Sequence, residues 1–168
     1  MNFRAAKKND ASSLAAISIE VWVGTYLRKG VNAFFADYAL SEFTTSRFEA
    51  ILENENEHII VSENEVGIDG FIRITSGRIA PVHGCSTTEI TTLYVQPRHQ
   101  GKGIGKGLLG KGLRQCAADG VASLWLCVNS ENNPAMGFYL ACGFQKVGQT
   151  HFRIRDEAYL NEVFSRAV

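Results

Sequence analysis

The chain has 168 residues, 45% of them apolar, and equal numbers of basic and acidic side chains, 17 of each. This composition is enough for one sizeable core, and it excludes a net positive field that would attract nucleic acid or an anionic membrane. No stretch approaches the roughly 20 apolar residues of a membrane-spanning helix, and the charged N-terminus lacks the apolar run of a signal peptide.

Hydrophobic periodicity predicts strands and helices in alternation. The predicted strands are 2–6, 58–63, 70–76, 87–96, 122–129 and two more near 144–149 and 150–166. The predicted helices are 10–24 with Asp10 as N-cap, a broken helical region over 30–54, a helix ending near Ala118, and one that begins at Pro134 and is capped by Gly143. This order predicts one α/β (α+β) domain over residues 1–168, with a mixed central sheet of about six to seven strands.

The four cysteines are far apart in the sequence: Cys85, Cys116, Cys127 and Cys142. They form no CxxC pair, and no histidine stands at a metal-ligand spacing from them. We therefore predict reduced, mostly buried thiols, no metal site and a cytoplasmic location.

The segment QGKGIGKGLLGKGL, residues 100–113, contains six glycines. Glycine disfavours a helix by about 1 kcal/mol per site relative to alanine. Nevertheless, apolar residues recur at helical spacing through the same segment, at Ile104, Leu108, Leu109 and Leu113. A loop that opens a helix and binds phosphate through exposed backbone N–H groups would produce this combination.

Other interpretations of the glycines fit less well. A Walker A loop needs Ser or Thr after Gly-Lys, whereas the Gly-Lys pairs at 105–106 and 110–111 are each followed by glycine. A dinucleotide-type GxGxxG occurs at 105–110, but it begins ten residues beyond Val95, inside the predicted helix. A mobile, lysine-rich surface loop would not require apolar residues at helical spacing.

A further pattern covers both this segment and a later one. Residues 100–105 have the form Q/R-x-x-G-x-G/A and follow the strand residues LYV. The later motif N-x-x-A-x-x-F-Y-x-x-x-G-F is formed by Asn132, Ala135, Phe138, Tyr139, Gly143 and Phe144. Together they resemble the two motifs of the GNAT superfamily of acetyl-CoA-dependent N-acetyltransferases. The resemblance is specific over about 87–145; it implies a GNAT-like fold with a splayed strand pair at the acetyl-CoA site and helices on both faces of the sheet.

The resemblance also implies which residues hold coenzyme A. The backbone amides of the glycine loop would bind the pyrophosphate, the strand before it would offer main-chain groups to the pantetheine arm, and an asparagine would hydrogen-bond coenzyme A. By position these residues are Leu93, Val95, Gln100, Gly101, Lys102, Gly103, Ile104, Gly105, Lys106 and Asn132. The side chains of Arg98, Lys102 and Lys106 either add charge at the phosphates or are simply solvated.

The resemblance also implies three candidates for catalysis. The Leu93 N–H would stabilise the negative charge that develops on the thioester oxygen. Glu89 lies on the same face of the predicted strand and would take a proton from the acceptor amine, directly or through water. Tyr139 lies two helical turns after Asn132, on the same face of the predicted helix. In the GNAT family the tyrosine at this position protonates the leaving thiolate, so the resemblance implies this role for Tyr139. The structural alternatives are an exposed strand glutamate for Glu89 and a core aromatic for Tyr139.

The predicted enzyme is an acyltransferase that moves the acetyl group from acetyl-CoA directly to a primary amine within a ternary complex. The acceptor would be a small amine, a polyamine or a peptide amine, and homodimers are common in the family. Aromatic residues of the N-terminal helices, including Phe34, Phe35 and Tyr38, form either a wall of the acceptor cleft or part of the core. A non-catalytic acyl-CoA-binding or regulatory module is the alternative, although such a module would need neither Glu89 nor Tyr139.

Overall fold

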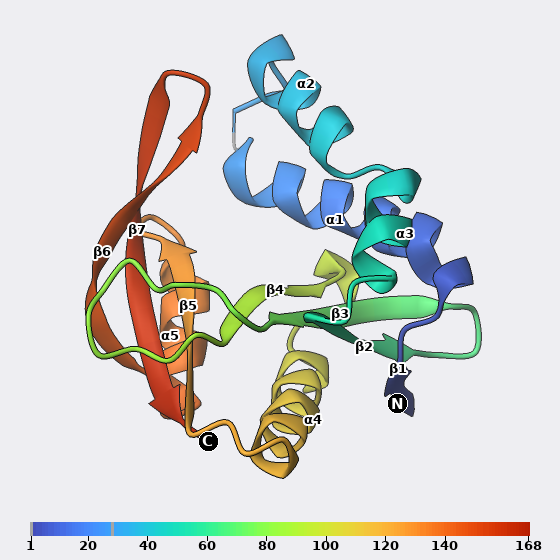
Figure 1. The fold of residues 1–168 in the computed structure, drawn as a ribbon. Coiled ribbons are helices and arrows are strands. Elements are labelled where there is room, and N and C mark those ends of the chain that lie inside the picture. The colour runs from blue at the N-terminus through green and yellow to red at the C-terminus, as the bar shows by residue number, and fades with distance from the viewer. Residues whose placement is uncertain (1, 28) are drawn as a thin grey trace. The chain divides into compact units, whose positions relative to one another are not determined.

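The structure is a computed structural model that describes residues 2–27 and 29–168. Its helices are α1 (Ala11–Tyr26), α2 (Ala33–Glu42), α3 (Thr45–Leu52), α4 (Ile104–Ala118) and α5 (Asn133–Ala141), with two short 3-10 helices, η1 (Lys8–Asp10) and η2 (Pro97–His99). Its strands are β1 (Asn2–Ala5), β2 (Glu57–Glu63), β3 (Ile68–Thr75), β4 (Glu89–Val95), β5 (Ser123–Asn129), β6 (Gln145–Ile154) and β7 (Glu157–Ala167) (Figure 1). They form one seven-stranded sheet in the order β1-β2-β3-β4-β5-β7-β6.

The sheet is mixed, as the sequence predicted. Strand β1 is antiparallel to β2, and β7 is antiparallel to both β5 and β6. In contrast, β4 and β5 are parallel, with Glu89 opposite Trp125. The predicted α/β fold class is therefore confirmed.

Contacts within the chain divide it into two compact units. The first comprises Met1–Arg73 and Thr92–Gly112, and the second comprises Ile74–Thr91 and Leu113–Val168. The boundary passes through β3, β4 and α4, so each unit contains part of these elements. The single domain over residues 1–168 stays a prediction.

The first unit buries its core between α1, α3 and one face of β2 and β3. This core contains Ala11, Leu14, Ala15, Ile17, Val21, Phe48, Ile59, Val61 and Phe71. Phe48 of α3 meets Phe71 of β3 edge to face, with ring centroids 6.1 Å apart. The broken helical region predicted over 30–54 is thus two helices, of which α3 packs on the sheet (Figure 1).

The opposite face of the same strands carries the first turns of α4. Phe3 of β1 pairs with Ser62 of β2, one position out of phase with the core residue Val61. A Cβ atom added to Gly107 of α4 would overlap the ring of Phe3. Glycine at position 107 therefore lets the helix approach β1 closely, and helices cover both faces of this part of the sheet.

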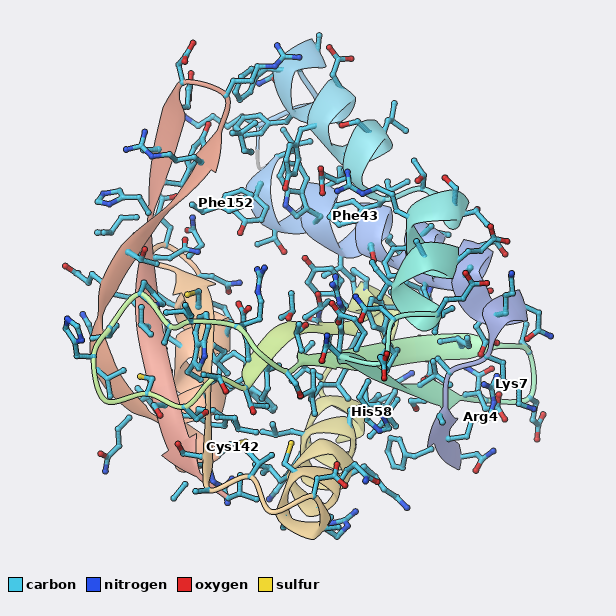
Figure 2. All side chains as sticks on the ribbon, viewed as in Figure 1. Arg4, Lys7, Phe43, His58, Cys142 and Phe152 are labelled. Atoms are coloured by element: carbon cyan, nitrogen blue, oxygen red, sulfur yellow. The ribbon has the colours of Figure 1, made fainter. Side chains whose placement is uncertain are left out.

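The start of α1 differs in detail from the prediction. Asp10 is the N-cap residue, but its side chain accepts no hydrogen bond from the helix. Instead the carboxylate accepts from the Arg4 guanidinium at 2.7 and 3.1 Å and from the Lys7 backbone N–H at 2.7 Å. These hydrogen bonds connect β1 to the segment that leads into α1. Figure 2 labels two of the residues involved, Arg4 and Lys7.

The second unit is built on the antiparallel strands β5, β7 and β6. The predicted boundary between the last two strands, at 149–150, was wrong: β6 continues to Ile154 and the turn lies at 155–156. Arg155 adopts a left-handed backbone with φ 52°. Arginine is not a residue that signals such a turn, so the sequence carried no mark of it.

Candidate active site

The predicted coenzyme A loop lies in the first unit and contains two glycines in the left-handed region. Gly101 has φ 75° and Gly103 has φ 82°. No other atom would lie within 4 Å of a Cβ at either position. The two glycines are therefore required by backbone conformation, and the space beside them is open.

Helix α4 begins directly after this loop. Ile104 is buried, as are Leu108 and Leu109, so the apolar spacing found in the sequence anchors the helix to the core. The helical hydrogen-bond ladder starts where the Gly107 N–H donates to the Gly103 carbonyl at 2.9 Å. The N–H groups of the three residues before Gly107 precede this ladder, at the end of the helix that carries partial positive charge. Loop and helix together fit an anionic ligand.

The junction between β4 and the loop is held by several hydrogen bonds. The Gln100 side chain donates to the Val95 carbonyl at 3.2 Å, and the Gln96 N–H donates to the Asp69 carbonyl at 3.0 Å. The His99 ring lies 3.6 Å from the buried Asp69 carboxylate. Val95 and Gln100, both predicted to bind coenzyme A, thus contact each other.

Glu89 lies at the start of β4, in the second unit, and its side chain is buried. Arg78, from the segment between β3 and β4, donates from Nε to the Glu89 carboxylate at 3.0 Å. The alternative of an exposed strand glutamate is therefore wrong for the structure, although the catalytic role stays a prediction. Sequence reasoning missed Arg78, because a single arginine in an irregular loop carries no periodic or motif signal.

Cys127 of β5 belongs to the same region of the second unit. Burial raises the pKa of its thiol to about 12, and the negative charges of Glu89 and Cys85 act in the same direction. At neutral pH the thiol is therefore protonated, which disfavours a nucleophilic role. All four cysteines are unpaired.

Tyr139 and Asn132 lie on α5, also in the second unit. Tyr139 is buried and packs against Phe144 with ring centroids 5.4 Å apart. Burial raises the pKa of its hydroxyl well above the ordinary range, with a smaller contribution from Cys142. Asn132 is the N-cap of the helix, since its side-chain oxygen accepts from the Ala135 N–H at 3.2 Å. Its amide nitrogen takes no part in this cap and is left to donate the predicted bond to coenzyme A.

The aromatic residues of the N-terminal helices form a cluster around Trp22 in the first unit. The Trp22 ring is buried, and its centroid lies 4.8 Å from that of Tyr26 and 5.1 Å from that of Tyr38. Trp22 therefore serves packing, whereas Tyr26 and Tyr38 remain partly exposed. Among residues 2–27 and 29–168, no group of three or more metal-ligating side chains is found, and no helix is long and apolar enough to cross a membrane.

Comparison with known proteins decides the family. The model of the acetyltransferase (GNAT) family matches residues 25–144. The chain belongs to the GNAT family. It is thus an acyltransferase, and the resemblance found in the two sequence motifs is confirmed.

Individual GNAT relatives agree with this assignment. An uncharacterized N-acetyltransferase of Mycobacterium tuberculosis is 26% identical over 145 residues, 86% of this chain and 89% of the relative. The N-alpha-acetyltransferase RimI of the same organism is 39% identical over 83 residues, 49% of this chain and 47% of RimI. Among solved structures, the PaiA N-acetyltransferase of Thermoplasma acidophilum in complex with coenzyme A has a TM-score of 0.79 at 18% identity, with both chains covered completely. The family match makes this chain an acetyl-CoA-dependent N-acetyltransferase, and the likeness to the solved structures shows the GNAT fold.

Proposed function

We propose that this GNAT enzyme transfers the acetyl group from acetyl-CoA directly to a primary amine, with no acetylated enzyme residue in between. The observation that carries the proposal is that the predicted base, Glu89, is buried and lies on β4, the strand whose later residues are proposed to bind coenzyme A. The burial of Tyr139 fits both the predicted proton donor and a core aromatic. Burial with one ion-pair partner does not by itself distinguish a catalytic glutamate, because Glu162 is also buried and paired with Lys146. The position of Glu89 on β4 is what distinguishes it.

The glycine loop is the proposed site for coenzyme A. Backbone N–H groups of residues 101–106, with the Gln100 side chain, would hold the pyrophosphate at the start of α4. Leu93 and Val95 would pair with the pantetheine arm as an added strand does, and the Asn132 amide nitrogen would donate to the same ligand. The left-handed glycines and the open space beside them support this assignment.

The chain's own residues would handle the protons. A primary amine is mostly protonated at neutral pH, and Glu89 would take its proton directly or through water. As the amine nitrogen bonds to the acetyl carbon, the Leu93 N–H would stabilise the charge on the carbonyl oxygen. When the carbon–sulfur bond breaks, the Tyr139 hydroxyl, which burial keeps protonated at neutral pH, would give its proton to the thiolate. The new amide nitrogen would lose its second proton to water, from which Tyr139 would regain its own.

The acceptor is a small-molecule or peptide amine in this proposal. The name of the relative RimI supports a peptide amine. The four unpaired cysteines are consistent with the predicted cytoplasmic location.

A panel of primary amines, assayed for free thiol released from acetyl-CoA, tests the proposal. We expect amine-dependent thiol release that Glu89→Gln lowers by about 10²-fold or more, the usual contribution of a general base. Glu162→Gln is the matched control, because Glu162 is also a buried glutamate with an ion-pair partner, Lys146. Stabilisation by coenzyme A with no turnover on any amine would instead support the non-catalytic binding module.

A further inference from the structure

Arg78 stands at the neck of the loop between β3 and β4. Its backbone N–H donates to the Thr87 carbonyl at 2.8 Å, which closes the loop at both ends. The Ser86 hydroxyl fixes the far end by donating to the Ser123 carbonyl of β5. These hydrogen bonds fix the backbone that carries Arg78, and all of the residues involved lie in the second unit.

The Arg78 side chain uses only part of its hydrogen-bonding capacity. Nε donates to Glu89, whereas in the described part of the chain the other guanidinium nitrogens have no hydrogen-bond partner. The side chain is 59% exposed, against 11% for that of Glu89. Four N–H donors beside the proposed base thus face a ligand or solvent.

The charge of this pair bears on the kind of acceptor. Glu89 alone would attract any cationic amine, but the guanidinium next to it cancels that attraction and repels a second positive charge. A polyamine is disfavoured for this reason. An acceptor that carries a carboxylate close to its amine complements both members of the pair, because arginine binds carboxylates through parallel hydrogen bonds.

We propose that Arg78 belongs to the acceptor site, where it holds Glu89 through Nε and binds a carboxylate of the acceptor through its other donors. The preferred acceptors are then free amino acids, with the amine directed to Glu89. This inference rests on the proposed function and narrows its acceptor class.

Matched acceptors that differ only in the carboxylate test the inference. Thiol release from acetyl-CoA is measured with the common free amino acids, with their amides and with a diamine, for the unmodified enzyme and for Arg78→Gln. We expect at least one amino acid to have an acceptor KM about tenfold or more below that of its amide, as a lost charge-assisted hydrogen bond predicts. Arg78→Gln should remove this preference and leave the KM for acetyl-CoA unchanged.

Two further variants keep the test decisive. Lys146→Gln is the matched control, because Lys146 pairs with Glu162 at similar exposures, 50% and 10%, and it should behave as the unmodified enzyme does. Arg78→Lys keeps the charge, so it should fold if Arg78→Gln does not, and it should lose most of the preference because lysine cannot bind both carboxylates through a planar fork.

Two outcomes would overturn the inference. In the first, the amides or the diamine are acetylated as well as the amino acids are; in the second, Arg78→Gln slows the acetylation of all acceptors equally. The second outcome would mean that Arg78 only positions Glu89 and does not bind the acceptor. The proposed function is judged separately: in this assay it fails if no amine of any class releases thiol, whatever Arg78→Gln does.

Discussion

Replacing Gly103 by alanine should weaken coenzyme A binding without disturbing the core. Gly103 has φ 82°, and an added Cβ would meet no atom within 4 Å, so the cost is purely that of the backbone conformation. A non-glycine residue in the left-handed region costs about 1–2 kcal/mol. If the loop must hold this conformation to present its N–H groups, the dissociation constant of coenzyme A rises by about 5- to 30-fold.

Isothermal titration calorimetry with coenzyme A measures this effect. The matched control is Gly67→Ala, which adds the same methyl group in open space without a left-handed backbone, and which should bind as the unmodified chain does. An unchanged dissociation constant for Gly103→Ala would refute the assignment of this loop to coenzyme A.

Four other predictions follow from the structure. Gly107→Ala should lower the free energy of unfolding, measured by urea denaturation, by up to about 2 kcal/mol. Displacing the Phe3 ring costs about 1–3 kcal/mol, and the gain of about 1 kcal/mol in helix propensity offsets part of this. A stabilised variant would contradict this packing. Tyr139→Phe should reduce kcat by about 10²-fold or more while the affinity for coenzyme A is kept, and a loss of affinity instead would indicate a packing role. Cys127, with a pKa of about 12, should resist alkylation at pH 8 in the folded protein, as mapped by mass spectrometry, since about one thiol in ten thousand is ionised. The pKa of Asp10 is lowered, chiefly by its hydrogen bond from Arg4. The ionised Asp10 therefore stabilises the fold above the ordinary carboxyl pKa, and this stabilisation is lost as the pH falls through the pKa of Asp10 in the folded protein. Asp10→Asn should destabilise the chain at pH 7, and its difference in stability from the unmodified chain should shrink below about pH 4; a difference that grows instead would refute this.

The fold could be predicted because its signals are local. The β-branched run of β4, the apolar spacing in α4 and the proline at the start of α5 each act within a few residues, so they appear in the sequence. The turn between β6 and β7 could not be placed, since Arg155 takes a left-handed backbone that only the surrounding hairpin imposes.

Features that depend on residues far apart in the sequence could not be predicted from it. The need for glycine at position 107 comes from the Phe3 ring, which packs against it although the two residues are far apart in the sequence. Gly112 is buried within α4, whereas nothing in the structure explains Gly110. The partner of Glu89 was hidden for the same reason, because Arg78 lies in a loop without regular spacing. The motif residues themselves were predictable, since their backbone and capping roles are fixed within one loop or one helix end.

Direct transfer to an amine is the central claim, and the release of thiol with and without acceptor tests it most directly. The enzyme is mixed with acetyl-CoA in a rapid-quench experiment, first alone and then with the best amine of the panel. We predict no initial burst of thiol without the amine, and with it one acetylated amine for each thiol released. A burst of about one thiol per enzyme molecule in the absence of amine would show an acetylated enzyme residue and contradict the account.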